Sequence, residues 1–270
     1  RERRARWPRR DRRDGRRRRG TAARVVAFAI YFGTFSIFFF SALYLEEVDK
    51  FSGYRIAALF LPMTAIMVGG AIWAGRLVMR RGGQWTMAIG CFIAAAGIAV
   101  TEPLLSTHPS FAALTVSLAL TGLGMGLAMV PVTALVLEVV PPEHSGMAAS
   151  ATNTARQLGV VFGVAILGAL VKARLTTDLQ HRLDVIGVPR IFQPTIINAY
   201  EHGGQPGQGS LAGARQTFGE IVDRILTAAY AAFHDGLASA LVISAVLITA
   251  AGVLAGYAAV RGTSDVVDTG

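Results

Sequence analysis

Residues 146–171 read GMAASATNTARQLGVVFGVAILGALV, and Arg156 is the only charged residue in this stretch. Roughly 20 apolar residues cross the ~30 Å hydrocarbon core of a bilayer as an α-helix. A helix is suited to that solvent because it satisfies its backbone hydrogen bonds internally. The stretch therefore predicts a membrane-spanning helix that carries one arginine inside the bilayer.

Five further stretches carry no charge at all, namely residues 25–45, 56–75, 82–101, 111–137 and 236–260. The whole chain of 270 residues is 53% hydrophobic and 16% charged, whereas soluble domains carry about 25% charge. We therefore predict an all-α membrane protein with six transmembrane helices in one domain, 22–261. The approximate spans are 24–45, 56–78, 83–103, 111–139, 146–171 and 236–260.

The composition also excludes several kinds of site. Cys91 is the only cysteine, so an internal disulfide and a multi-thiolate metal site are excluded. The five histidines show no metal-ligand spacing, and a GxSxG nucleophile motif is absent. The first span is too long for a signal peptide, whose apolar region has about 7–15 residues. We expect no metal, no cofactor and no enzymatic activity.

An arginine-rich arm, 1–21, precedes the first span and contains 12 arginines in its first 20 residues. Basic residues beside a first span favour the cytoplasm. We therefore expect a protein of the plasma (inner) membrane with a cytoplasmic arm and a cytoplasmic tail, 262–270. The short loops agree, since most of their basic residues fall on the inner side: Arg24, Arg76, Arg80, Arg81 and Arg261 inside, Lys50 and Arg55 outside.

Three interpretations of the arm are open. It can hold the topology and contact anionic lipids, and this is the interpretation we favour. Nucleic-acid binding is disfavoured, because the arm lacks interleaved aromatic residues and a folded module. Thirdly, the chain begins at Arg1 and not at a methionine, which indicates a fragment of a longer protein.

The outer segment 172–235 is long and contains its own helical periodicity. Polar and apolar residues alternate at helical spacing near 172–186 and near 218–233. The sequence GGQPGQG between them predicts a flexible break. We expect an outer loop built from two amphipathic pieces that extend the fifth and sixth spans. Charged candidates at the outer ends of the spans are Glu46, Glu47 and Asp235.

Three stretches carry a family resemblance: LYLEEVDKFSGYRIAALFLP at 43–62, AGRLVMRRGGQ at 74–84, and GLGMGLAMVPV at 122–132 continuing through VVPPEHSGMAASATNTARQLGVVFGVAILGAL at 139–170. Together they resemble the C-terminal half of a major facilitator superfamily transporter. The closest likeness is to the 14-helix EmrB/QacA-type drug:proton antiporters. FHDGLASAL, opening the sixth span, is similar to the same family.

The resemblance implies half of a transporter that exports a hydrophobic, often cationic, small molecule in exchange for protons. Its partner would be the N-terminal transporter half, which carries the family's antiporter motif and most of its membrane carboxylates. Transport would proceed by alternating access around a site at the midplane. The competing class is a non-transporting six-helix remnant, scaffold or regulatory subunit. An intramembrane enzyme ranks third.

The inner loop between the second and third spans has two interpretations. Its candidate residues are Gly75, Arg76, Arg80, Arg81 and Gly82. The glycines would allow close helix approach and a tight turn, and the arginines would either fix the topology or grip a neighbouring helix as a gate. The family usually has an acid where Met79 stands, and this departure removes one charge from such a gate.

In the fourth span, three glycines at alternate positions predict tight helix packing: Gly122, Gly124 and Gly126. Pro131 frees a backbone carbonyl, so the segment can serve as a packing surface or as a hinge. Glu138 lies one turn before the Pro141–Pro142 corner. We interpret it as an interfacial anchor in preference to a proton carrier.

Arg156 itself lies about 15 Å from the inner end of its span and about 22 Å from the outer end. A lone charge at such depth costs about 2.5–3.5 kcal/mol on insertion scales, so it should face protein or a water-filled cavity. Asn153 and Gln157 flank it as expected hydrogen-bond partners. It shares a helix face with small residues: Thr152, Gly159 and Gly163.

Three interpretations of Arg156 remain open. It can be a structural arginine paired with backbone carbonyls or a carboxylate. It can be a cavity-facing or gating charge near the inner mouth. It can also extend its side chain to the inner headgroups.

Overall fold

The computed structural model describes residues 9–47, 51–105, 110–186 and 208–267, nearly all of which are helical. The helices are α1 (Arg9–Glu47), α2 (Gly53–Arg81), α3 (Gly83–Leu104), α4 (Phe111–Val139), α5 (Ser145–Ile186) and α7 (Gln208–Val267), with a 3₁₀ turn at Pro142–His144. Within these residues six helices are long and apolar enough to cross a membrane, and strands are absent. The expected all-α class is confirmed.

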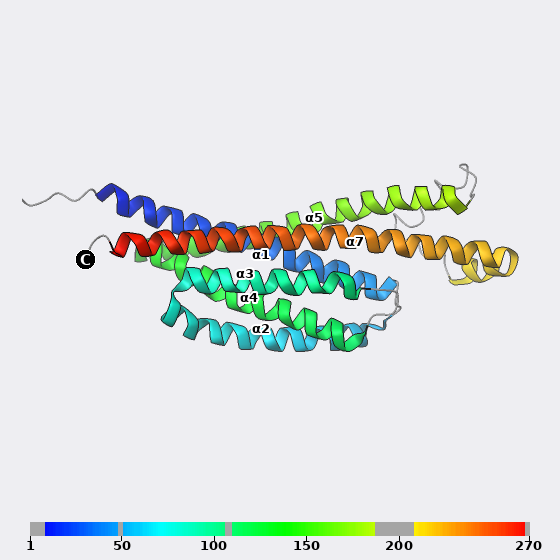
Figure 1. The fold of residues 1–270 in the computed structure, drawn as a ribbon, viewed down its shortest axis with the longest axis horizontal. Coiled ribbons are helices and arrows are strands. Elements are labelled where there is room, and N and C mark those ends of the chain that lie inside the picture. Colours follow the sequence, from blue (N-terminus) through cyan, green and yellow to red (C-terminus); the bar gives the residue numbers. More distant parts are fainter. Residues whose placement is uncertain (1–8, 48–50, 106–109, 187–207, 268–270) are drawn as a thin grey trace, which may run out of the picture.

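Three helices are longer than the spans expected from hydropathy. α1 begins at Arg9, within the basic arm, so arm and span form one continuous helix over the described residues. α5 runs on to Ile186 and α7 starts at Gln208, so much of the segment expected as an outer loop is helical. The adjoining ends of α5 and α7 project together beyond the rest of the bundle (Figure 1).

A separate small core holds these two extensions together. Leu179 and Leu183 of α5 are fully buried against Ala228, Ala229 and Ala232 of α7. Leucines one turn apart on one helix and small residues at matching positions on the other allow the two helices to interlock. The amphipathic spacing near 172–186 therefore has a structural partner in the first half of α7.

The main bundle is organised around α4. This helix packs most closely on α3 and α2, while α3 also packs on α7, and α1 packs on α5 and α7. By contrast, α4 and α5 share little direct contact. The spans also differ in coverage: buried shares are 59%, 50% and 61% for α1, α3 and α4, but only 17% for α2 and 22% for α5. α2 and α5 are therefore the least covered of the six spans.

Glycines permit the close approach of α4 to its neighbours. A Cβ on Gly124 would lie 2.6 Å from the carbonyl oxygen of Gly90 on α3, and a Cβ on Gly90 would lie 2.7 Å from that of Gly124. A Cβ on Gly122 would lie 2.6 Å from the Met63 carbonyl oxygen on α2. The three glycines of α4 thus serve two interfaces, since Gly122 and Gly126 face α2 while Gly124 faces α3.

Candidate functional site

Arg156 lies on the face of α5 that packs against α1. Thr152 and Gly163 are buried on this face. Gly159 is buried as well, and a Cβ there would lie 2.5 Å from the Phe28 carbonyl oxygen of α1. The Thr152 hydroxyl donates to the Ala148 carbonyl, 2.9 Å away, and needs no partner from another helix. The small-residue stripe therefore brings the base of the Arg156 side chain close to α1.

The guanidinium of Arg156 connects three helices. One terminal nitrogen donates to the Thr133 hydroxyl of α4 at 2.7 Å. The guanidinium carbon lies 5.6 Å from the centroid of the Tyr31 ring on α1, within the range of a cation–π interaction. The Tyr31 hydroxyl in turn points to the Met129 sulfur of α4 at 3.9 Å. The Arg156 side chain thus links α4 to α5, two helices that otherwise share little direct contact.

The Arg156 site, defined as Arg156, Thr133 and Tyr31, leaves the cation without a carboxylate partner. The Nε atom of Arg156 is buried and has no hydrogen-bond acceptor among the described residues. Arg24, two turns before Tyr31 on the same face of α1, also has a buried Nε without an acceptor there. The half of this face nearer the N-terminus of α1 therefore carries positive charge that the described part of the chain does not neutralise.

The flanking amides take no part in this arrangement. Asn153 and Gln157 are exposed on α5, and the hydrogen bond of Arg156 goes to Thr133 of another helix. The expectation that the two flanking residues act as its partners is therefore wrong. Both residues instead belong to the poorly covered side of α5.

A row of aromatic rings leads from the Arg156 site toward α2. Tyr31 stacks on Phe35 with centroids 5.2 Å apart and an interplanar angle of 11°. Phe35 meets Phe38 edge-on at 6.3 Å, and Phe38 meets Phe60 of α2 edge-on at 5.7 Å. The sequence analysis missed this row, although the spacing of Tyr31, Phe35 and Phe38 on one helix face was a usable signal.

The loop between α2 and α3 has the expected turn, but its arginines form no ion pair with a described residue of the bundle. Gly82 has φ 85°, a conformation that favours glycine, and its N–H donates to the Val78 carbonyl at 2.9 Å. A Cβ on Gly75 would meet nothing within 4 Å, so Gly75 provides no close helix approach here. The neighbouring basic side chains are exposed and have no acidic partner among the described residues: Arg76, Arg80 and Arg81.

The fourth span contains the other inner candidates. Pro131 is buried, and α4 continues through it without a break as far as Val139. Glu138 is exposed near the inner end of the same helix. The structure forms no ion pair between Glu138 and Arg156, although Thr133 lies only five residues earlier on α4. A hinge at Pro131 and an interfacial anchoring role for Glu138 both stay predictions.

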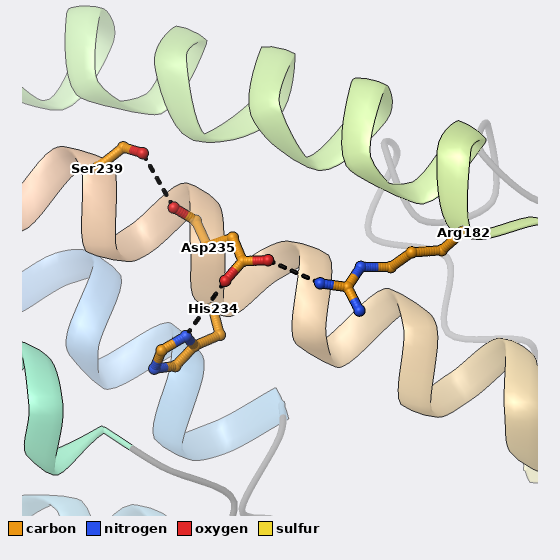
Figure 2. A network of polar contacts seen from close by, with 4 residues as sticks. All are labelled: Arg182, His234, Asp235 and Ser239. Atoms are coloured by element: carbon orange, nitrogen blue, oxygen red, sulfur yellow. Dashed lines mark hydrogen bonds and ion pairs between the residues drawn. The ribbon is translucent and has the colours of Figure 1, made fainter.

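At the outer end, Asp235 joins α7 to the extension of α5. Its carboxylate accepts from Arg182 at 2.8 Å and lies 3.7 Å from Nδ1 of His234, and Ser239 donates to its backbone carbonyl at 3.0 Å (Figure 2). These groups border a polar cavity of ≈ 390 Å³, which is lined by Arg174, Asp178, His181, Arg182, Asp235 and Ser239. Glu46 is exposed, and the Glu47 side chain lies outside the described residues.

The ion pair between Arg182 and Asp235 is expected to contribute little stability. Both side chains are partly exposed, at 41% and 48%, and exposed pairs are worth about 0–1 kcal/mol. Asp235→Asn should therefore lower the apparent melting temperature of the detergent-purified chain by only a few degrees, measured with a thiol-independent dye. A large loss of folded protein would contradict this expectation.

Comparison with known proteins identifies the family to which this bundle belongs. The sequence profile described as Major Facilitator Superfamily matches residues 3–164, more than half of the chain. The chain belongs to the major facilitator superfamily. The match covers α1 to α4 and the part of α5 that carries Arg156.

Curated relatives of this superfamily member are named for drug export or resistance. The drug efflux pump JefA of Mycobacterium tuberculosis is 31% identical over 239 residues, which cover 85% of this chain and 44% of JefA. The tetracenomycin C resistance and export protein of Streptomyces glaucescens is 27% identical over 238 residues, which cover 86% of this chain and 43% of that protein. The chain thus spans less than half the length of these relatives.

The family match and the six membrane-capable helices together indicate a multi-pass membrane protein of the major facilitator superfamily. The described residues contain no group of three or more His, Cys, Asp or Glu side chains that could hold a metal ion. Polar, charged or aromatic side chains gather in three places among the described residues: the Arg156 site, the aromatic row and the outer cavity.

Proposed function

We propose that this chain acts as the C-terminal half of a 14-helix, EmrB/QacA-type drug exporter that works by alternating access. Two facts support the proposal: six membrane-capable helices in a chain that spans less than half of its relatives, and the export and efflux names of those relatives. The proposed partner is an N-terminal transporter half, and the proposed cargo is a hydrophobic small molecule.

The uneven coverage of the bundle is the observation that carries this proposal. α2 and α5 are only 17% and 22% buried, and the uncovered surface of α5 carries Asn153 and Gln157. A polar surface of this kind is unfavourable against lipid tails. A second half packed against α2 and α5 would enclose this face and turn it into the wall of a central cavity.

Proton coupling and cation export would depend on the second half. Within the six expected spans the only acidic residues are Glu102 and Glu138, each one residue from the end of its span, so a carboxylate deep in the membrane that binds a proton or neutralises a cationic compound would come from the other half. This chain would supply the aromatic row, which can stack on flat apolar molecules and attract cations.

The competing proposal is a non-transporting six-helix protein, a remnant, scaffold or regulatory subunit. The two differ in one measurable way, because a half-transporter has a companion. Cells producing this chain alone should not export ethidium, whereas cells that also produce the spans encoded immediately upstream in the same frame should lower ethidium fluorescence. If no such spans are encoded, or if adding them leaves accumulation unchanged, the remnant is favoured.

The proposed orientation places both termini in the cytoplasm of a plasma (inner) membrane, with the basic arm against anionic lipid. It is inferred from the arginine distribution alone. Nucleic acid remains disfavoured as a partner of the arm.

The orientation can be tested by labelling single cysteines with a membrane-impermeant maleimide, after Cys91→Ser removes the buried native thiol. Val185→Cys lies on an exposed position of the α5 extension and should be labelled on intact cells. Glu143→Cys lies on the exposed turn between α4 and α5 and should react only after permeabilisation. The reverse pattern would overturn the orientation and the inner location of Arg76, Arg80 and Arg81.

A further inference from the structure

The charge balance of the spans is uneven in a way that the proposed function does not explain. The inner half of the face that carries the aromatic row contains two arginines, Arg24 and Arg156, about 10 Å apart along the helix axes. No acidic residue lies within the spans 24–45 and 146–171 that contain them. A cation in a bilayer is normally paired or exposed to water, so this face lacks a counter-charge.

The geometry of the Arg156 site shows which of its donors are already used. One terminal nitrogen donates to Thr133, and the guanidinium carbon lies over the Tyr31 ring, 5.6 Å from its centroid. The Nε atom is buried and has no acceptor among the described residues, so an incoming group would approach the terminal nitrogens. The two terminal nitrogens of the planar guanidinium fork match the two oxygens of a carboxylate.

The surroundings favour an aromatic compound that bears this carboxylate. Tyr31 is both the platform under the guanidinium and the first ring of the row that continues through Phe35 and Phe38 to Phe60. Flat rings stack on such side chains, so an aromatic group could lie along the row while an acid group reaches Arg156. The Thr133 hydroxyl, exposed on α4, holds the fork in place.

We propose that the Arg156 site binds a carboxylate, and that the transporter accepts aromatic acids through it. The inference rests on the proposed function for its companion half and central cavity, but it concerns the chemistry of the cargo. The carboxylate has two possible sources, a transported compound or an acidic side chain of the companion half. Both use the same arginine fork, and the experiment separates them.

The test uses the complete transporter in detergent and two probes of nearly equal shape, 1-naphthylacetate and its neutral amide 1-naphthylacetamide. Equilibrium dialysis with tritiated probes should give a wild-type Kd at least about tenfold lower for the acid. Arg156→Gln should remove this preference. Arg156→Lys should keep part of it, because the charge stays while the fork is lost. Arg182→Gln, which removes an arginine at the outer end, should leave it unchanged.

A second measurement identifies the source of the carboxylate. If an acidic side chain of the companion half occupies the site, the two probes bind equally to the wild type, and Arg156→Gln reduces the amount of companion half that co-purifies with a tagged chain. Should neither the probe preference nor the co-purification respond to Arg156→Gln, the proposal is overturned. If that variant does not accumulate, Thr133→Val gives the same readouts with a smaller expected change.

The outcome is distinguishable from a failure of the proposed function. A preference for the acid that depends on Arg156, in a protein that exports neither ethidium nor 1-naphthylacetate from cells, would refute export but keep the carboxylate site. Export of ethidium with no role for Arg156 in either readout would keep the exporter and refute the site.

Discussion

Replacing Arg156 with alanine is expected to abolish export by the complete transporter while leaving the amount of protein in the membrane nearly unchanged. The variant loses a charge-assisted hydrogen bond to Thr133, worth about 1.5–3 kcal/mol, and a cation–π contact of about 0.5–1 kcal/mol. It also removes a charge whose insertion costs about 2.5–3.5 kcal/mol. These contributions roughly cancel, so the folded state should survive although the site is empty.

The measurement combines membrane content, read from a C-terminal fluorescent fusion, with the rate of ethidium efflux. Arg156→Lys should retain partial activity, and Asn153→Ala should be milder, because Asn153 does not contact the guanidinium. A fall in membrane content with unchanged activity per molecule would assign Arg156 a structural role. Normal content together with normal efflux would contradict both roles and leave a side chain that extends to the inner headgroups.

The fold was predictable from the sequence because hydropathy alone decides it. A charge-free stretch of 20 or more residues has one stable arrangement in lipid, and each expected span lies within one of the observed helices. The extensions of α5 and α7 were predictable from their amphipathic spacing. Their contact through Leu179 and Leu183 was not, because periodicity gives the face of a helix and not the partner that covers it.

The environment of Arg156 was only partly predictable. Rarity of charge in a span singles out the residue, but its partners Thr133 and Tyr31 are 23 and 125 positions away in sequence. They meet only because α1, α4 and α5 converge at one level of the bundle. Gln157, the adjacent residue, points about 100° away around the helix, so proximity in sequence favoured the wrong partner. The prediction for Gly75 was wrong for a similar reason, since a Cβ there would meet no other described residue within 4 Å.

The second large effect is expected at the crossing of α3 and α4. Gly124→Val should sharply reduce the folded fraction, because the new side chain would meet the backbone of Gly90 and Ala94, which cannot rotate away. Overpacking of a core typically costs about 1–3 kcal/mol, and a clash with backbone on a neighbouring helix should reach or exceed the upper end. α4 also supplies Thr133 and Met129, so a shift of this helix would disturb the Arg156 site as well.

Gly69→Val is the matched control, because Gly69 lies in the middle of α2 and a Cβ there would meet nothing within 4 Å. The readout is the monodisperse fraction of each variant on size-exclusion chromatography in mild detergent. The protein produced is the chain of residues 1–270 without a companion half. Gly124→Val should lose most of this fraction, Gly124→Ala should lose less, and Gly69→Val should match the wild type. Equal fractions for Gly124→Val and Gly69→Val would mean that α3 and α4 do not approach closely enough to require glycine. The close crossing at Gly90 and Gly124 would then be refuted, and with it the position of α4 that brings Thr133 to Arg156.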